Sequence, residues 1–248
     1  MTPSSVSVSS GPRVPVIRTS IGRTLLEACV SSLAESRAAI AAGADRLELC
    51  GPGDGGTTPS LALIEACTAM STVPVHVMIR PHTHDFTVDL DWRAIMRRDL
   101  VVARRAGARG VVLGAITRDG ALDTDTIAQC VHEADGLPVI FHRAFDRLSD
   151  PERALDQLVA LGVHGVLTAG GRGRAVDAAE RLGAWQRRVG DAFTIMAGGG
   201  VRANAFAPLV TDARLHALHA AATDPVPFAE LALALRALEA SHDAAPPT

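Results

Sequence analysis

The sequence predicts a single-domain α/β fold, a (β/α)8 barrel of the TIM type, on three observations. Eight short apolar segments recur along the chain and are separated by stretches with helical periodicity. Three of these stretches end in a glycine just before the next apolar segment, at Gly43, Gly107 and Gly162, and glycine suits the left-handed residue that closes a helix. The length of 248 residues is also close to the ~250 that is typical of such barrels.

The eight expected strands follow one another along the chain. They are LLEAC (25–29), DRLELC (45–50), VPVHVMIRP (73–81), GVVLGAI (110–116), PVIFHRAF (138–145), GVLTAG (165–170), FTIMAGGG (193–200) and LHALHAA (215–221). Because a helical stretch follows each strand, neighbouring strands run parallel. A doubly wound open sheet is the alternative, but it often carries a GxGxxG turn after its first strand, and LEACVSSLAES contains no such turn.

Capping residues mark where the helices begin. The helix PERALDQLVALG starts at Pro151, with Ser149 or Asp150 as its N-cap. The segment GGTTPS, after the second strand, caps the next helix through Thr58 or Ser60. A last helix is expected near AELALALRALEAS. The barrel therefore spans residues 24–240, between a mobile Ser- and Pro-rich tail at 1–23 and a frayed tail at 241–248.

Charge and hydropathy exclude several classes of partner. The net charge is −3 and no long run of one sign occurs, so neither nucleic acid nor an anionic membrane is an expected partner. No apolar run approaches the ~18 residues of a membrane span. The N-terminal residues lack the apolar block of a secretory signal. A cytoplasmic protein is the simplest interpretation.

The cysteines and the basic residues exclude several kinds of site and of catalysis. The four cysteines, at positions 29, 50, 67 and 130, form no CxxC pair, which excludes a zinc ribbon or a thioredoxin-like motif and fits a reducing cytoplasm. All 24 basic residues are arginine, since the sequence contains no lysine. Catalysis through a lysine Schiff base, including pyridoxal phosphate chemistry, is thereby excluded.

Strand parity predicts a polar barrel interior. Leucine and alanine at positions 26, 28, 47 and 49 suit the helix-facing side, so the residues between them face the barrel axis: Glu27, Cys29, Glu48 and Cys50. The same alternation on the third and fifth strands points His76, Met78, Arg80, His142 and Ala144 inward and places Asp146 at the C-terminal lip.

Two interpretations account for these inward groups. Burying unpaired charges is costly, so Glu27, Glu48, Arg80 and His142 are expected to form one partnered cluster. This cluster is either an ion-pair network that sets strand register or an active site, and the position at the strand C-terminal ends favours the active site. The catalytic candidates are Glu27, Glu48, Arg80, His142 and Asp146.

Glycine-rich segments after two late strands suggest an anion site. TAGGRG (168–173) and MAGGGVRAN (196–204) resemble barrel loops whose backbone N–H groups bind phosphate. The candidate anion-binding residues are Gly170, Gly171, Gly198, Gly199, Gly200 and Arg202. Tight turns that simply need glycine are the alternative. In RPHTHDF, His82, His84 and Asp85 could likewise bind a metal or merely be solvated.

These motifs together resemble a known family. LEACVSS, AGADRLELC, GGTTPS, PVHVMIRP, HDF, GVVLGAITRDG, PVIFHRAFD, GVLTAGG and AGGGV are similar, in order and spacing, to the CutC copper-homeostasis proteins, from about Leu25 to about Ala222. The resemblance implies a (β/α)8 barrel and a cytoplasmic, often oligomeric protein that binds Cu(I). The sequence departs from the family pattern at RPHTHDF, where members commonly read RPRGGDF. It matches the family's last strand only loosely, at LHALHAAAT.

The resemblance also implies the copper ligands. The cysteines proposed as ligands in the family correspond here to Cys29 and Cys50. Cu(I) is soft and favours thiolates, and neighbouring strands lie ~4.8 Å apart, so two converging thiolates can share one ion. Met78 is a further weak donor nearby, and the same proximity would also allow a disulfide or simple packing. The second functional hypothesis is an enzyme, a lysine-independent isomerase, lyase or hydrolase, that acts on a small anionic or phosphorylated substrate.

Overall fold

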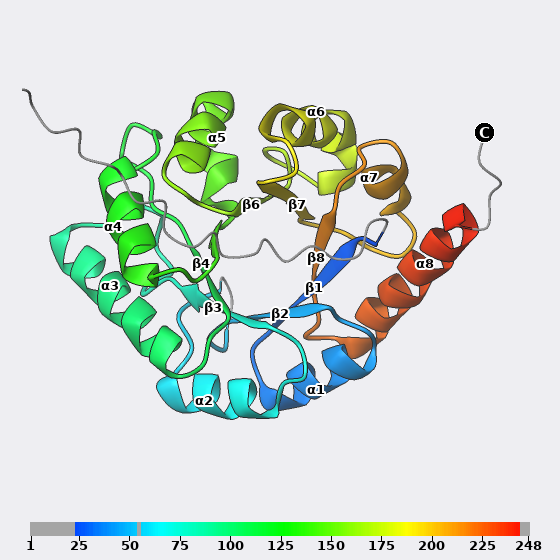
Figure 1. Cartoon of the computed structure of the whole chain (residues 1–248), viewed down its shortest axis with the longest axis horizontal. Coiled ribbons are helices and arrows are strands. Elements are labelled where there is room, and N and C mark those ends of the chain that lie inside the picture. Colours follow the sequence, from blue (N-terminus) through cyan, green and yellow to red (C-terminus); the bar gives the residue numbers. More distant parts are fainter. Residues whose placement is uncertain (1–22, 54–55, 244–248) are drawn as a thin grey trace, which may run out of the picture.

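The computed structural model, which describes residues 23–53 and 56–243, shows a closed barrel of parallel strands in the order β1 to β8 (Figure 1). Helices surround the strands, as the predicted TIM-type fold requires, and the fold prediction is confirmed. The last helix extends to Asp243, three residues beyond the predicted end of the barrel. Of the predicted tails at 1–23 and 241–248, residues 1–22 and 244–248 lie outside the described residues.

The strands are β1 (Leu25–Val30), β2 (Arg46–Leu49), β3 (Val75–Ile79), β4 (Gly110–Leu113), β5 (Val139–Phe141), β6 (Gly165–Thr168), β7 (Thr194–Gly198) and β8 (Ala217–Ala221). The α-helices are α1 (Leu33–Ala41), α2 (Leu61–Met70), α3 (Leu90–Arg105), α4 (Thr124–Ala134), α5 (Pro151–Ala160), α6 (Ala179–Val189), α7 (Ala207–Thr211) and α8 (Pro225–Asp243). Two short 3-10 helices are η1 (Arg143–Arg147) and η2 (Ala175–Ala178).

Capping side chains and left-handed glycines set the helix boundaries, as the sequence predicted. Ser60 caps α2 by accepting a hydrogen bond from the Leu63 N–H, and Asp150 caps α5, whose first residue is Pro151. The glycines that close α1, α3 and α5 have φ values of 97°, 94° and 80°, which lie in the left-handed region. They are Gly43, Gly107 and Gly162. Each helix therefore ends where the following strand must begin.

Two apolar layers lie on opposite faces of the barrel wall. The outer layer packs strand residues such as Leu26, Leu47 and Phe141 against the helices. The smaller inner layer contains Cys50 and Met78, with Cys29 against it. The predicted strand parity is thereby confirmed for β1 to β3.

The prediction that Ala144 points into the barrel is wrong, because Ala144 belongs to the outer layer. Strand β5 ends at Phe141 and the 3-10 helix η1 starts at Arg143, so the alternation does not continue as far as Ala144. His142, one residue after the strand, is the last residue for which strand parity holds.

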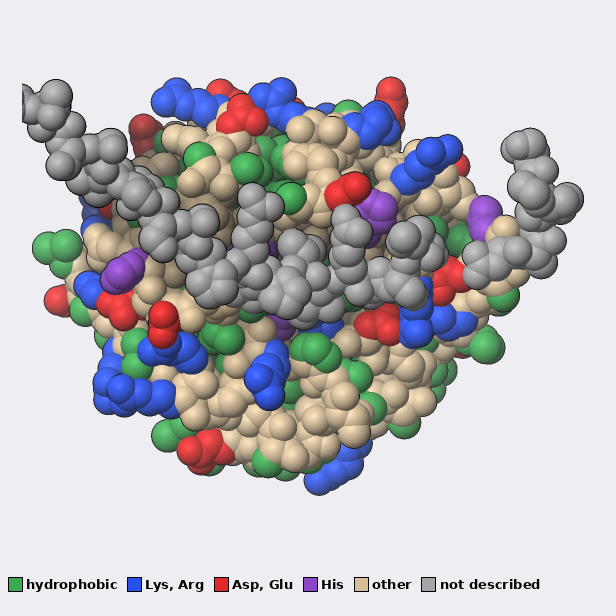
Figure 2. All heavy atoms as spheres, in the orientation of Figure 1, with side chains coloured by type: hydrophobic (Ala, Val, Ile, Leu, Met, Phe, Trp, Pro, Cys, Tyr) green, Lys and Arg blue, Asp and Glu red, His purple; other side chains and the backbone are tan. Residues whose placement is uncertain are grey.

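The molecular surface carries mixed charge. Figure 2 shows arginine and acidic side chains interspersed over the visible face. No helix among the described residues is long and apolar enough to cross a membrane.

Candidate functional site

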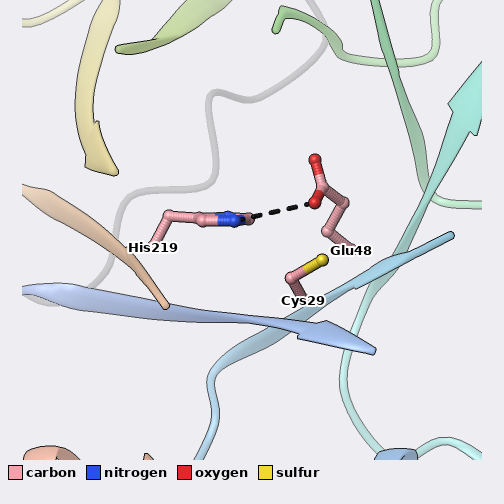
Figure 3. Close-up of side chains that lie close together, drawn as sticks. All are labelled: Cys29, Glu48 and His219. Carbon is pink, nitrogen blue, oxygen red and sulfur yellow. Dashed lines mark ion pairs between the residues drawn. The ribbon is translucent and has the colours of Figure 1, made fainter. Parts of the chain in front are cut away.

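The C-terminal ends of β1, β2 and β8 bring two thiols, a carboxyl group and an imidazole together. Cys29 is paired with Glu48 across β1 and β2, while Glu27 is paired with His219 across β1 and β8. The sulfur atoms of Cys29 and Cys50 are 3.8 Å apart, and both thiols are free. Figure 3 shows His219 and Glu48 pointing toward each other above the Cys29 sulfur, with 3.7 Å between His219 Nε2 and Glu48 Oε2.

Beneath these groups lies a fully buried carboxylate. Glu27 accepts a hydrogen bond of 2.9 Å from His219 Nδ1 and one of 2.5 Å from Arg46 Nε. Arg46 also reaches the sulfur of Met196 at 3.3 Å. Burial raises the pKa of Glu27, but Arg46 and His219 outweigh it and bring the pKa well below its ordinary value. Glu27 is thus a charged anchor that fixes both of its partners.

The pKa values of the four groups at the barrel mouth shift in different directions. These groups are Cys29, Cys50, Glu48 and His219. The hydrogen bond from Cys50, with help from His219, lowers the pKa of Cys29, whereas that same contact and burial raise the pKa of Cys50. Burial and the neighbouring Cys29 raise the pKa of Glu48. Burial lowers the pKa of His219, but Glu48, Cys29 and Glu27 raise it well above its usual range. The arrangement favours a thiolate at Cys29 beside an imidazolium at His219.

Glu27, Glu48, Arg80 and His142, which were predicted to form one partnered cluster, have different direct contacts in the structure. Glu27 and Glu48 contact His219, as described above. Arg80 instead stacks on the ring of Phe86, with 4.7 Å between its guanidinium carbon and the ring centroid. His142 packs against the same ring at 5.1 Å between centroids. Cys50 lies between the two pairs, since its thiol contacts Glu48 at 3.7 Å and is within electrostatic reach of Arg80.

Comparison with known proteins decides the family. The sequence pattern of the CutC family matches residues 24–224. The chain belongs to the CutC family. Family protein CutC of Caulobacter vibrioides is 43% identical over 209 residues, which cover 84% of this chain and 85% of that protein. Family protein CutC of Photobacterium profundum is 36% identical over 195 residues, 78% of this chain and 80% of that one.

Solved structures agree with this assignment. CutC from Streptococcus agalactiae, whose name refers to copper homeostasis, is 30% identical with a TM-score of 0.75, and the match covers 80% of this chain and 98% of that chain. N-(5'-phosphoribosyl)anthranilate isomerase from Pyrococcus furiosus has a TM-score of 0.59 at 14% identity and covers 87% of this chain and 100% of that chain. At that identity the likeness shows the barrel fold alone.

Two site residues of this CutC family member are absent from the predicted set. In LHALHAA, Leu218 and Ala220 belong to the outer layer, so alternation alone places His219 inside. Arg46 has the same parity as Glu48 and precedes it by two residues in β2. The signal that identified the inward glutamates was therefore present for both residues.

Asp146 of this CutC chain lies at the predicted lip but serves the loop after β6. Its Oδ1 accepts hydrogen bonds from the Thr168 hydroxyl at 2.5 Å and from the Gly171 N–H at 3.1 Å. Its Oδ2 accepts one of 2.8 Å from Arg143 Nε. The Gly170 N–H in turn donates to the Thr168 hydroxyl at 2.9 Å. The two N–H groups predicted to bind an anion here already have acceptors within the protein.

We expect Asp146→Ala to lower the free energy of unfolding by about 2 kcal/mol, because it leaves the Thr168 hydroxyl and the loop N–H groups without their acceptor. Urea denaturation measures the change. Asp156→Ala is the matched control, since Asp156 pairs with Arg188 on the surface and its loss should change the stability far less. A stability equal to that of the wild type would exclude this structural role for Asp146.

The loop after β7 has a steric reason for its glycines. A Cβ atom at Gly198 would lie 2.4 Å from Leu167 Cδ1, and Gly199 and Gly200 have φ values of 110° and 71°. Arg202 donates to the neighbouring Val201 carbonyl at 2.9 Å. Anion binding by this loop stays a prediction.

The ring of His82 in RPHTHDF packs against those of His84 and Trp92. The ring of His82 lies 5.6 Å from that of His84 and 4.8 Å from that of Trp92, between centroids. Among the described residues, the group of three or more side chains that could hold a metal is Cys29, Glu48 and His219. These three side chains lie together at the barrel mouth.

Proposed function

We propose that this CutC family member is a cytoplasmic protein of copper homeostasis that binds Cu(I) through Cys29 and Cys50. The observation that supports the proposal is the pair of reduced sulfurs 3.8 Å apart at the ends of β1 and β2. Metal–thiolate bonds are about 2.3 Å long for zinc, so two sulfurs at this separation can both reach one metal ion without moving the strands. Cu(I) is the soft ion that such ligands select.

His219 adds a third donor in a setting typical of metal ligands. A histidine that binds a metal usually donates its other ring N–H to a carboxylate, which fixes its orientation. His219 Nδ1 bonds to Glu27 at 2.9 Å, and Arg46 holds Glu27 from the other side. The Nε2 atom is left facing the mouth cluster, on the side of Glu48. Loss of the Nε2 proton would complete a Cys2His donor set.

Anaerobic titration of the reduced protein with Cu(I), against a competing chelator, tests the proposal. One ion per chain is expected to bind, and the double variant Cys29→Ser, Cys50→Ser should weaken binding at least about 100-fold, or about 2.8 kcal/mol. The double variant Cys67→Ser, Cys130→Ser is the control, because these buried cysteines lie on α2 and α4 and belong to the outer layer. Equal affinity in the two double variants would contradict the assignment.

The enzyme hypothesis is retained for one observation, the juxtaposition of a lowered pKa at Cys29 with raised pKa values at His219 and Glu48. Thiolate, imidazolium and carboxylic acid are a nucleophile and two proton donors at one site. The substrate class is a small anionic or phosphorylated molecule. A screen of small anionic and phosphorylated molecules for turnover by the purified protein tests this hypothesis. Turnover that is lost in Arg80→Met, while the Cu(I) affinity stays unchanged, would support it.

Assembly into homo-oligomers belongs to the same proposal. Light scattering of the purified protein measures the molar mass in solution, and a multiple of the 25.8 kDa chain mass is expected.

A further inference from the structure

The side chain of His142 is held in one place at the barrel mouth. It follows β5 with the same parity as Ile140, which belongs to the inner layer, and it is 4% exposed. Gly114 makes room for the ring, since a Cβ atom there would lie 2.4 Å from Nδ1. Phe86 packs against the ring, with 5.1 Å between centroids. A ring enclosed in this way has little freedom to turn.

One hydrogen bond determines which ring nitrogen carries the proton. The Ala144 N–H donates to His142 Nδ1 at 3.2 Å, so Nδ1 presents its lone pair. In a neutral imidazole the proton is then on Nε2. Burial, with the nearby Arg80 charge, lowers the pKa of His142 to about 3, which keeps the ring neutral at physiological pH. His142 is therefore a hydrogen-bond donor at Nε2.

This donor is buried and has no acceptor among the described residues. Buried donors are nearly always bonded, and each exception requires an explanation. The N–H group is not needed to hold the ring, because Nδ1, Gly114 and Phe86 already do so. An acceptor that comes from outside the chain would satisfy it.

Arg80 supplies positive charge beside this donor. Its guanidinium carbon lies 4.7 Å from the centroid of Phe86, the same ring that packs against His142. Its charge contributes to the lowered pKa of His142, which places the two groups within electrostatic reach. Guanidinium and imidazole N–H groups both bind oxygen anions, and a guanidinium has no acceptor to offer.

We propose that His142 Nε2 and Arg80 bind the anionic oxygen of a small molecule, a carboxylate or a phosphate, at the mouth of the barrel. In this site His142 donates a hydrogen bond and does not remove protons, which changes the role expected of it from the sequence. The site rests on the anionic substrate class of the enzyme hypothesis and uses neither Cys29 nor Cys50 as a ligand, although Arg80 lies within electrostatic reach of Cys50. A molecule bound here would lie at the C-terminal face of the barrel, where ligands of this fold bind.

Nitrogen NMR of the full-length protein with ¹⁵N-labelled histidine tests the proposal directly. At neutral pH we expect His142 in the Nε2–H tautomer, with its resonances assigned by their absence in His142→Phe or, where that variant does not fold, in His142→Gln. Addition of inorganic phosphate in one arm, and of acetate in the other, should shift the Nε2 resonance, and the arm that responds identifies the anion. His76 is the internal control, because it is fully buried and its ring packs over Gly110 instead.

Affinity measurements complete the test. His142→Phe keeps the ring contact with Phe86 but removes the donor, and it should weaken anion binding about tenfold or more. The double variant Cys29→Ser, Cys50→Ser should bind the anion as the wild type does, whatever its copper affinity. An Nδ1–H tautomer, an imidazolium, or a resonance unmoved by both anions would overturn the proposal, even if His142→Phe fails to fold.

Discussion

Arg46→Met is expected to lower the free energy of unfolding by about 3 kcal/mol. Removal of one partner of a buried ion pair lowers the free energy of unfolding by about 3–5 kcal/mol, because the other charge stays buried without a counter-charge. Glu27 is fully buried, and Arg46 is one of its two partners. His219 remains after the substitution, so the lower end of the range is expected. Urea denaturation followed by circular dichroism measures the loss.

Two further variants separate the lost pair from lost packing. Arg97→Met removes the partner of Glu133 on the surface, where water screens the ion pair, and it should have little effect. The double variant Arg46→Met, Glu27→Gln removes both charges and should recover part of the stability. If Arg46→Met proves as mild as Arg97→Met, Glu27 does not depend on Arg46 for its charge.

Strand parity could be predicted because the two faces of the barrel wall have different chemistry. Leu26 and Leu47 must pack against helices, and this requirement alone turns Glu27 and Glu48 inward. The fold and the mouth cysteines follow from the same pattern. Parity does not say which inward groups meet, because that depends on how the barrel closes. Closure places β8 beside β1, and so His219 contacts Glu27 across 192 positions of sequence.

The irregular backbone after β5 set the second limit on what the sequence could predict. The alternation stops at His142, and the 3-10 helix η1 carries Asp146 to a loop more than twenty residues farther along the chain. A carboxylate that satisfies backbone N–H groups of another loop leaves no periodic signal in the sequence. For this reason Asp146 and the glycines it binds were predicted separately, as a catalytic group and an anion site.

His76→Met is expected to remove the share of the acid sensitivity that His76 contributes, while His142, whose pKa burial also lowers to about 3, keeps its own share. Burial lowers the pKa of His76 from 6.5 to about 3 in the folded protein. As the pH falls below about 6.5, the unfolded chain takes up a proton that the folded chain does not, so stability is lost until about pH 3. One group of this kind contributes up to about 1.4 kcal/mol per pH unit, on the order of 5 kcal/mol over the window.

The structure explains why His76 cannot take up that proton when folded. Its ring is fully buried, neither nitrogen has a hydrogen-bond partner among the described residues, and a Cβ atom at Gly110 would lie 2.4 Å from Nε2. Arg46 adds a repulsive positive charge, which Glu27 only partly offsets. Methionine fills similar space without a group to protonate, so the variant should also be more stable than the wild type at neutral pH, by about 1 kcal/mol.

Denaturation curves between pH 3 and 7 measure the effect, with His242→Met as the control. His242 is exposed on α8, so its substitution exchanges a histidine for methionine without disturbing the packed barrel interior. Glu27 also loses stability in acid, but at lower pH, because its lowered pKa acts only below the ordinary value of 4.5. The difference between wild type and His76→Met should therefore open between about pH 6.5 and 4.5, before Glu27 contributes. Parallel profiles across that interval would mean that His76 is protonated in the folded barrel, against its burial beside Arg46.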